Sequence, residues 1–220
     1  MKYTDISVEY IDHMGTDLSV VNAARVSFEK ESALLNGALI PEDIKLISYL
    51  AKHEHWSPFA HTSIQMRFKA PIFVARQLVK HQVGGVWNEV SRRYVSSEVE
   101  FFRPYSWRGK PINAKQGSNG IMDNQYIYND LLDKIVDNSV ISYNILLDDG
   151  VAPEQARMVL PLNSMTEWYW TGSLMFWARV CKLRLDSHSQ EESQDIAKLV
   201  SAHCSNLYPI SWKALTQFST

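Results

Sequence analysis

The chain has 220 residues, of which 45% are hydrophobic and 21% charged, a composition ordinary for one soluble globular domain spanning 1–220. Its 22 Lys and Arg residues nearly balance 24 Asp and Glu residues, and the net charge of −2 gives no overall signal for a nucleic-acid or membrane partner. Cys181 and Cys204 are the two cysteines, and the sequence shows neither a signal peptide nor a long apolar span. We therefore expect reduced thiols, a cytoplasmic location, and neither a disulfide framework nor a zinc site.

The first eighty or so residues predict helices with one strand among them. The strand is the clearest element, because Ile64, Met66 and Phe68 alternate with polar residues and would all face one side. Pro71 then suits the first turn of a helix. We expect helices over 17–28, 41–53 and 71–81, and a half-buried strand over 63–69.

The second half predicts mostly helix. A polar, glycine-containing loop over 106–124 precedes a long helix over 124–149 that Gly150 ends. A short helix follows Pro153, an aromatic and threonine-rich strand covers 166–171, and further helices cover 173–184, 191–205 and the residues after Pro209. Strands are few and do not alternate regularly with helices. The fold class is therefore α+β, with helices packed around a small, mainly antiparallel sheet.

Residues 76–94, R-Q-L-V-K-H-Q-V-G-G-V-W-N-E-V-S-R-R-Y, carry the densest polar cluster. Helical spacing puts Gln77, Lys80 and His81 on one face. After the helix-breaking glycines at 84 and 85 come further donors, cations and one carboxylate: Asn88, Glu89, Ser91, Arg92 and Arg93. This supply suits binding of a phosphorylated small molecule, although a solvated basic helix end and loop would contain the same residues.

Other candidate groups give weaker signals. A cysteine nucleophile needs an accessible, electropositive setting, whereas Cys181 and Cys204 lie in apolar-patterned helices and are expected in the core. The histidines of 53–55 together with His61 do not complete a metal shell, so we expect no metal. Two tryptophans, Trp168 and Trp170, are expected to be core aromatics.

The segment 76–94 resembles the signature of the flavin-dependent thymidylate synthases, an R-H-R triplet followed by an N-E-x-S-x-R-Y run. The second part is intact over 88–94, whereas the triplet reads Lys80-His81-Gln82 and the spacer is one residue longer. The resemblance continues through separate motifs in the same order, at 17–19, 23–28, 52–59, 69–77, 156–163 and 183–190.

The resemblance implies reductive methylation of dUMP to dTMP. The carbon donor would be 5,10-methylenetetrahydrofolate, FADH2 would give the hydride, and NADPH would reduce the FAD again. No protein nucleophile is needed in that chemistry, which fits the two core cysteines. The family resemblance also implies a homotetramer whose active sites draw on several subunits.

Among the implied site residues, Arg184 would lie against the pyrimidine and favour the N3-ionised uracil, because an arginine stays charged and offers planar paired donors. The residues alone also fit a surface arginine near Asp186. If its helix continued, Arg184 would share a face with Ser187 and His188. The implied dUMP residues are Gln77, Lys80, Glu89, Ser91, Arg92, Arg93, Arg157 (from a neighbouring part of the assembly) and Arg184. The implied FAD and folate residues are His55, Ser57, Lys80, His81, Gln82, Asn88, Glu89, Ser173, Arg179 and His188.

The chain departs from the family pattern at four of these positions. Lys80 and Gln82 replace arginines, and Ser173 and Arg179 replace asparagines. Two alternative functions therefore stay open: a nucleotide- or RNA-binding relative without catalysis, and a flavoprotein that methylates another uridine, as in RNA. The near-neutral charge speaks against RNA as a partner.

Overall fold

The computed structural model describes residues 2–94, 98–112 and 117–217. The strands are β1 (Lys2–Tyr3), β2 (Ser7–Met14), β3 (Ser63–Pro71), β4 (Gly85–Glu89), β5 (Glu100–Phe101), β6 (Arg108–Gly109), β7 (Asn119–Ile121) and β8 (Met165–Gly172). The helices are α1 (Asp17–Arg25), α2 (Pro41–Lys52), α3 (Ser57–Ala60), α4 (Ile72–Leu78), α5 (Gln125–Asp148), α6 (Pro153–Ala156), α7 (Leu174–Arg184), α8 (Glu191–Leu207) and α9 (Pro209–Gln217), with 3-10 turns η1 (Val26–Phe28) and η2 (Arg157–Val159). No helix in these ranges is both long and apolar enough to cross a bilayer.

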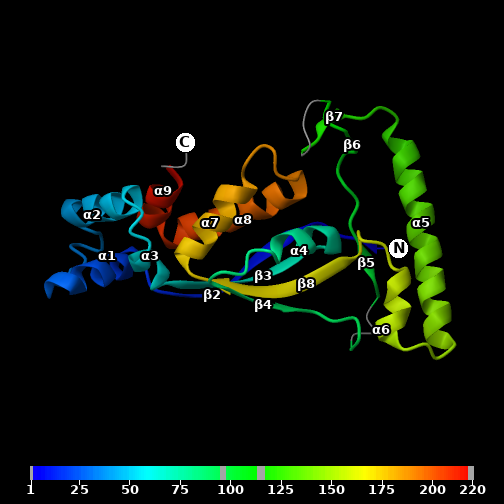
Figure 1. Ribbon diagram of the computed structural model, residues 1–220, viewed down its shortest axis with the longest axis horizontal. Coiled ribbons are helices and arrows are strands. Elements are labelled where there is room, and N and C mark those ends of the chain that lie inside the picture. Colours follow the sequence, from blue (N-terminus) through cyan, green and yellow to red (C-terminus); the bar gives the residue numbers. More distant parts are fainter. Residues whose placement is uncertain (1, 95–97, 113–116, 218–220) are drawn as a thin grey trace.

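The centre of the molecule is a four-stranded antiparallel sheet in the order β2-β3-β8-β4. Helices α4, α7 and α8 lie on one side of this sheet (Figure 1). Residues of β3 that point to this side, among them Met66 and Phe68, are fully buried, whereas Arg67 on the opposite side is exposed. The expected α+β class with a mainly antiparallel sheet is confirmed.

Aromatic rings fill the space between the sheet and these helices. Trp170 of β8 contacts Trp177 of α7 and Phe68 of β3, with ring centroids 5.1 and 5.5 Å apart. Trp168 stacks on Phe68 at 5.2 Å. The expectation that Trp168 and Trp170 belong to the core is confirmed, as it is for the two cysteines, all of them nearly or fully buried.

Two glycines let the strands approach this layer. A Cβ on Gly172 would lie 2.1 Å from the ring of Phe176, and one on Gly85 would lie 2.5 Å from the same ring. Such distances are far below any real contact, so any side chain here would push β8 or β4 away from α7.

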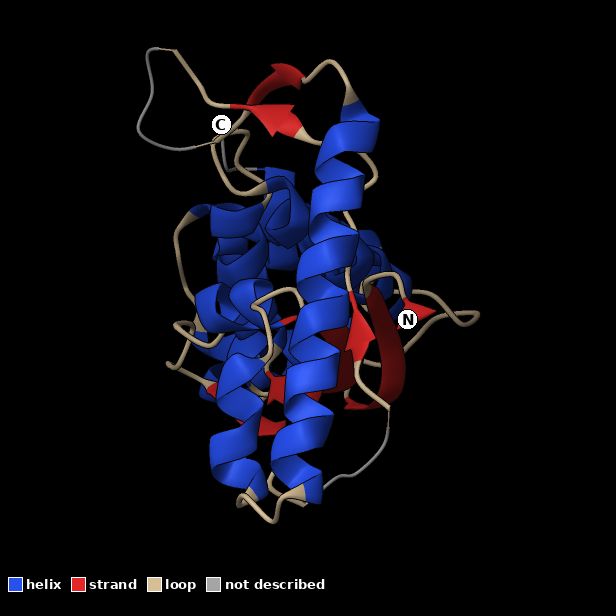
Figure 2. Ribbon diagram, turned by 90° about the vertical axis from the view of Figure 1, so that its right-hand side faces the viewer, coloured by secondary structure: helices blue, strands red, loops and turns tan. Residues whose placement is uncertain are grey.

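A second, smaller core lies under α5, which stands at the far end of the molecule from α1, α2 and α3 (Figures 1 and 2). There Val136 and Tyr143 of α5 pack with Phe101 and Ala156. The same helix also carries exposed apolar side chains at helical spacing, namely Ile127, Leu131, Ile135, Ile141 and Ile145. A face of this kind is typical of a helix that packs against another protein chain.

Several sequence expectations need correction. The helix expected over 71–81 begins at Ile72, because Pro71 still belongs to β3, and it ends at Leu78. The loop expected over 106–124 contains the two short paired strands β6 and β7. The sequence patterns also failed to indicate β2, and they failed to indicate β4 in the segment taken as a loop after the glycines.

The buried carboxylate of Asp17 joins the two ends of the chain. Asp17 is the first residue of α1 and only 8% exposed, and its two oxygens accept hydrogen bonds from the backbone N–H groups of Ile210 (3.0 Å) and Ser211 (2.8 Å). These groups belong to the first turn of α9, where backbone donors have no partner within the helix. Asp17 therefore caps α9 from a distant part of the sequence.

We predict that Asp17→Ala lowers the free energy of unfolding by about 2–3 kcal/mol, because two charge-assisted bonds to buried donors are lost. Urea denaturation followed by circular dichroism measures this. The matched control is Asp195→Ala, since Asp195 forms an exposed ion pair with Lys198 that is worth at most about 1 kcal/mol. An equal loss of unfolding free energy in the two variants would contradict the capping role of Asp17.

Candidate functional site

Arg184 lies where helices α4, α7 and α8 meet. It is the last residue of α7, and its Nε donates to Nε2 of His81 at 2.9 Å. Its Nη2 donates to the backbone oxygen of Gln77 in α4 at 3.4 Å. Two acceptors on one side therefore fix the plane of the guanidinium, and its Nη1 makes no bond to a described residue.

The electrostatics of this pair keep His81 neutral. Burial lowers the pKa of His81, and the positive charge of Arg184 lowers it further. Since Nε2 of His81 accepts the bond from Arg184, the ring proton must be on Nδ1. Burial also lowers the pKa of Arg184, but a guanidinium remains charged at neutral pH.

The side chain of Gln77 is held by a hydrogen bond from helix α8. The hydroxyl of Ser193 in α8 donates to Oε1 of Gln77 at 2.7 Å. No sequence pattern indicated Ser193, because it lies 116 positions away and only the packing of α8 on α4 brings the two together.

Helix α7 does not continue beyond Arg184, so the expected alignment with Ser187 and His188 does not occur. His188 lies in an exposed turn, where its backbone N–H donates to Asp186 at 2.8 Å and its ring is 3.1 Å from the same carboxylate. The hydrogen bonds from the backbone and the side chain of His188 lower the pKa of Asp186. Among the described residues, the hydrogen-bond partners of His188 are thus its neighbours in the turn, Ser187 and Asp186, and not the residues around Arg184.

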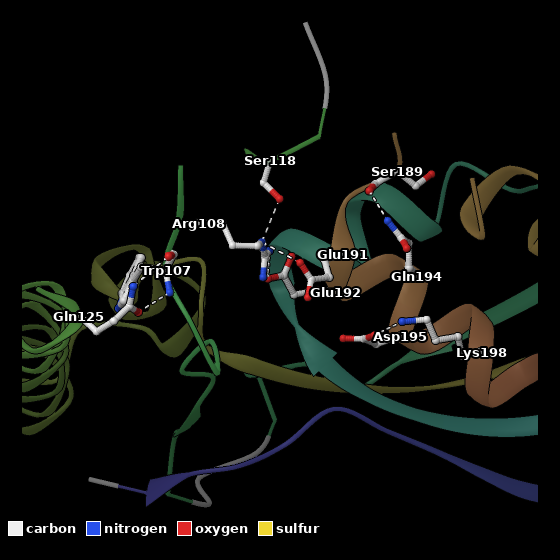
Figure 3. A network of polar contacts seen from close by, with 10 residues as sticks. All are labelled: Trp107, Arg108, Ser118, Gln125, Ser189, Glu191, Glu192, Gln194, Asp195 and Lys198. Atoms are coloured by element: carbon white, nitrogen blue, oxygen red, sulfur yellow. Dashed lines mark hydrogen bonds and ion pairs between the residues drawn. The ribbon is translucent and has the colours of Figure 1, made fainter. Parts of the chain in front are cut away.

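The start of α8 is held in place by Arg108 of β6. Figure 3 shows its guanidinium between Ser118 on one side and two glutamates on the other: Nη2 bonds to Glu192 at 2.6 Å and Nε lies 3.0 Å from Glu191. A cavity of about 1050 Å³ adjoins this network, lined among others by Phe73, Trp107, Arg108 and Glu192. None of the expected site residues lines it.

A second group of expected residues surrounds the end of β4. The carboxylate of Glu89 accepts from the hydroxyl of Thr166 at 2.8 Å and from Nε1 of Trp87 at 3.3 Å. Glu89 lines a cavity of about 590 Å³ together with Arg92 and Arg157. Arg157 was expected from a neighbouring part of the assembly, yet it borders the same cavity within one chain.

The residues after Glu89 form a compact turn. The hydroxyl of Ser91 accepts bonds from the backbone N–H and from Nε of Arg93, at 3.4 and 3.2 Å. Arg93 also lies over the ring of Tyr94, with Cζ 5.1 Å from the centroid. Asn88, by contrast, pairs with Tyr169 and therefore points to the opposite side of the sheet from Glu89.

A third group lies near α1, α2 and α3. His55 and Ser57 line a cavity of about 870 Å³ with the aromatic residues Phe28, Tyr49 and Trp56. His55 lies 5.9 Å from Tyr49, measured between ring centroids, in an edge-on arrangement. Together these aromatic side chains provide faces on which a planar ring system could stack.

Two further expected residues lie on α7. Ser173 caps this helix, since its hydroxyl accepts the N–H of Phe176 at 3.2 Å. Arg179 is exposed and lines a smaller cavity of about 350 Å³ with Trp56 and Lys182. Because Trp56 borders both this cavity and the one at His55, the two are neighbours.

Three of the residues expected at the flavin present polar groups at the surface. Lys80 and Arg179 are exposed cations, and neither forms an ion pair within the described ranges of the chain, so both charges can meet phosphate. Gln82 is exposed beside His81. In residues 2–94, 98–112 and 117–217 no group of three or more His, Cys, Asp or Glu side chains could hold a metal ion.

Comparisons with known proteins point to one family. The family model Thy1, described as thymidylate synthase complementing protein, matches residues 9–210. Flavin-dependent thymidylate synthases from Thermus thermophilus and Thermosipho africanus are each 38% identical to this chain, covering 96% and 95% of it and 75% and 90% of themselves.

Solved structures agree with this. A UMP/dUMP methylase, PolB from Streptomyces cacaoi bound with 5-Br dUMP, superposes with a TM-score of 0.89 at 31% identity, covering 100% of this chain and 98% of its own. The same methylase bound with 5-Br UMP gives a TM-score of 0.87 at 30% identity, covering 100% and 97%. With motifs, fold and similarity over nearly the full length in agreement, this chain belongs to the family of flavin-dependent thymidylate synthases and is an enzyme of that family.

Proposed function

We propose that this enzyme converts dUMP to dTMP, with 5,10-methylenetetrahydrofolate as carbon donor, FAD as cofactor and NADPH as the reductant of the flavin. The observation that carries the proposal is the fixed Arg184 guanidinium, held by His81 and by the Gln77 backbone at the junction of α4, α7 and α8. When bound, the reduced flavin supplies the hydride that completes the methyl group.

Arg184 acts on the pyrimidine ring. Its positive charge stabilises negative charge that develops at N3 and the ring oxygens, which raises the electron density at C5, the atom that takes the carbon unit. Because its plane is set before substrate arrives, little reorganisation is needed at the reacting stage. Neutral His81 suits this task, since it orients the guanidinium without adding a second positive charge.

The remaining groups bind and orient. Ser91, Arg92, Arg93 and Arg157 serve the nucleotide phosphate through charge-assisted hydrogen bonds, with Lys80 close to the boundary between substrate and flavin. Glu89, held by Thr166 and Trp87, is an acceptor for sugar or flavin hydroxyl groups. The flavin and folate residues are His55, Ser57, Lys80, His81, Gln82, Asn88, Glu89, Ser173, Arg179 and His188.

No thiol takes part. Cys181 is buried, and burial raises the pKa of its thiol to about 12; burial likewise raises that of Cys204 well above its ordinary value. A thiolate nucleophile is therefore scarce at neutral pH. Two free, buried cysteines also fit our proposal of a cytoplasmic enzyme.

We further propose that the active enzyme is a homotetramer with shared sites, built on a single domain over 1–220. Within one chain the proposed residues form three separate groups, at Arg184, at Glu89 and at His55. The exposed apolar side chains along α5, including Leu131 and Ile135, supply a surface for contact between copies.

UMP is a second candidate substrate, because the structural relative PolB is named a UMP/dUMP methylase. The alternative of a binding protein without catalysis lacks such support, and the net charge of −2 disfavours an RNA partner.

The test is product formation by the purified protein, with dUMP or UMP as acceptor and with methylenetetrahydrofolate, FAD and NADPH present. We expect dTMP, and we expect it to fall sharply when FAD is omitted from flavin-depleted protein. Faster methylation of UMP than of dUMP would show that UMP is the preferred substrate. No methylated product from either nucleotide, with flavin bound, would overturn the proposed chemistry.

We predict that Arg184→Ala lowers turnover at saturating dUMP by about 10²–10³-fold, since a preorganised charge at the reacting ring is lost. Flavin absorbance of the purified variant should be retained. Lys198→Ala, an exposed residue of α8 paired with Asp195, is the matched control and should keep normal turnover. Near-normal turnover of the Arg184 variant would exclude the assigned role.

We predict an acid limb in the pH profile of kcat/KM. The pKa of His81 is lowered in the folded chain, so the neutral ring predominates above that pKa. As pH falls through it, a proton on Nε2 displaces the bond from Arg184 and places two positive charges together, so activity falls. The free energy of unfolding also falls as the pH is lowered. The reason is that His81 has a higher pKa in the unfolded chain, which therefore binds the proton more readily.

The check is His81→Gln, whose amide oxygen can accept from Arg184 but does not titrate. This variant, saturated with FAD, should lose the acid limb that lies below the ordinary histidine pKa of about 6.5. An unchanged limb would show that another group is responsible.

A further inference from the structure

The cavity of about 590 Å³ beside the end of β4 is bordered by carboxylates and by arginines. Glu89 and Arg157 line it together, and both residues are exposed. Opposite charges on one cavity attract each other. Yet neither of these two side chains forms an ion pair with a residue in the described ranges of the chain. The structure therefore holds the two charges apart.

Glu89 is held in place by neutral donors of the sheet. The hydroxyl of Thr166 donates to its Oε1 at 2.8 Å, and Nε1 of Trp87 donates to its Oε2 at 3.3 Å. Because a carboxylate only accepts hydrogen bonds, the hydroxyl of Thr166 must be the donor in the shorter bond. Neutral donors fix the position of the carboxylate and leave its negative charge in place.

Thr166 is itself firmly anchored. In the register of the sheet it pairs with Ala70 of β3. The next residue, Glu167, accepts at its backbone oxygen the N–H of Val90 at 2.9 Å, directly after Glu89. A backbone bond and a side-chain bond therefore connect β8 to the end of β4 within two residues.

Two further carboxylates of the cavity are paired with cations of β1 and β3. Glu100 forms ion pairs with Lys2 and Lys69, and Glu167 forms one with Arg67. Hydrogen bonds from Lys2 and Lys69 lower the pKa of Glu100, which is therefore charged and engaged. These two carboxylates are thus already neutralised by cations of the sheet.

Arg157 keeps its charge available for a ligand. Its Nε donates to the backbone oxygen of Glu154 at 3.2 Å, which orients the guanidinium without neutralising it. A guanidinium offers paired donors in a geometry that matches a phosphate group. An anion that enters the cavity can therefore bind Arg157 without first breaking an ion pair.

We propose that Thr166 is a positioning residue that holds the Glu89 carboxylate on the sheet and so keeps it from pairing with Arg157, which stays available for the phosphate of a nucleotide. This deepens the proposed function and rests on it. Without the hydroxyl, the long and flexible side chain of Glu89 can turn across the cavity and compete with phosphate for Arg157. The competing ion pair would be exposed, so its effect on phosphate affinity is expected to be about fivefold.

The experiment measures how tightly inorganic phosphate binds. Calorimetric titrations of dUMP into the FAD-bound enzyme, at increasing phosphate and constant ionic strength, give the phosphate dissociation constant by competition. Thr166→Val keeps the shape of the side chain without the hydroxyl, and the constant should rise about fivefold. Thr166→Ser keeps a donor and should bind phosphate as tightly as the unmodified enzyme. An equal rise in Thr166→Ser would overturn the proposal.

The decisive variant combines Thr166→Val with Glu89→Ala. With the freed carboxylate removed, the phosphate dissociation constant should return to its unmodified value, although the packing change at residue 166 remains. The matched control combines Thr166→Val with Glu98→Ala. Glu98 borders the same cavity, so an equal charge is removed, but Thr166 does not hold it. This second combination should still bind phosphate weakly.

A further control, Thr171→Val, lies on the same strand. Thr171 is also partly buried, and its hydroxyl accepts one bond from Nε2 of Gln65 at 3.2 Å, but it does not border the cavity. This variant should leave the phosphate dissociation constant unchanged. A rise equal to that in Thr166→Val would overturn the proposal, since a general loosening of β8 would then be the cause.

An unchanged phosphate dissociation constant in Thr166→Val would overturn the positioning role, and so would equally weak binding after Glu89→Ala is added. If phosphate failed to compete with dUMP in the unmodified enzyme, the inference would also fail, while dTMP formation by that enzyme would leave the proposed function standing. If the unmodified enzyme neither bound dUMP nor formed a methylated product, both the inference and the proposed function would fail.

Discussion

The packing of aromatic rings against one face of the four-stranded sheet is the constraint on which the other parts of the structure depend. Trp87 of β4 stacks on Trp168 of β8 with centroids 4.3 Å apart, and Trp170 contacts the rings of α7. Large rings can pack this tightly only where the backbone comes close, which is why Gly85 and Gly172 lie against Phe176. The layer fixes β4, β8 and α7 relative to one another. Proposed site residues lie at the ends of β4 and α7, and Ser173 directly follows β8.

The polar contacts of the site lie at the borders of this apolar layer. Glu89 is two residues beyond Trp87 on the same side of β4, and Thr166 is two residues before Trp168 on β8, so strand geometry alone brings their side chains together. Arg184 stands at the other border, where α7 ends. Rigid apolar packing therefore supplies the precise placement that hydrogen-bonding groups in a binding site require.

The elements with a strong local signal could be predicted from the sequence. The alternation around Met66 specified β3, and the glycine at 150 marked the end of α5. β2 was missed because its burial alternates only weakly, with a bulge between Tyr10 and Asp12. The Ser193 contact with Gln77 could not be predicted, since it depends on how two helices far apart in sequence pack together. Family resemblance supplied candidate residues but not their neighbours.

The position of β4 at the edge of the sheet explains how its residues can serve one ligand. Side chains of consecutive strand residues point to opposite sides, so Asn88 and Glu89 cannot both face a ligand lying on one face of the sheet. At an edge, however, a ligand or a second copy of the chain can reach around the strand and meet both sides at once. Around an interior strand, the neighbouring strands would block such an approach. The edge position is thus in keeping with the proposal of a site shared between subunits, for which the exposed apolar side chains of α5 offer a contact surface.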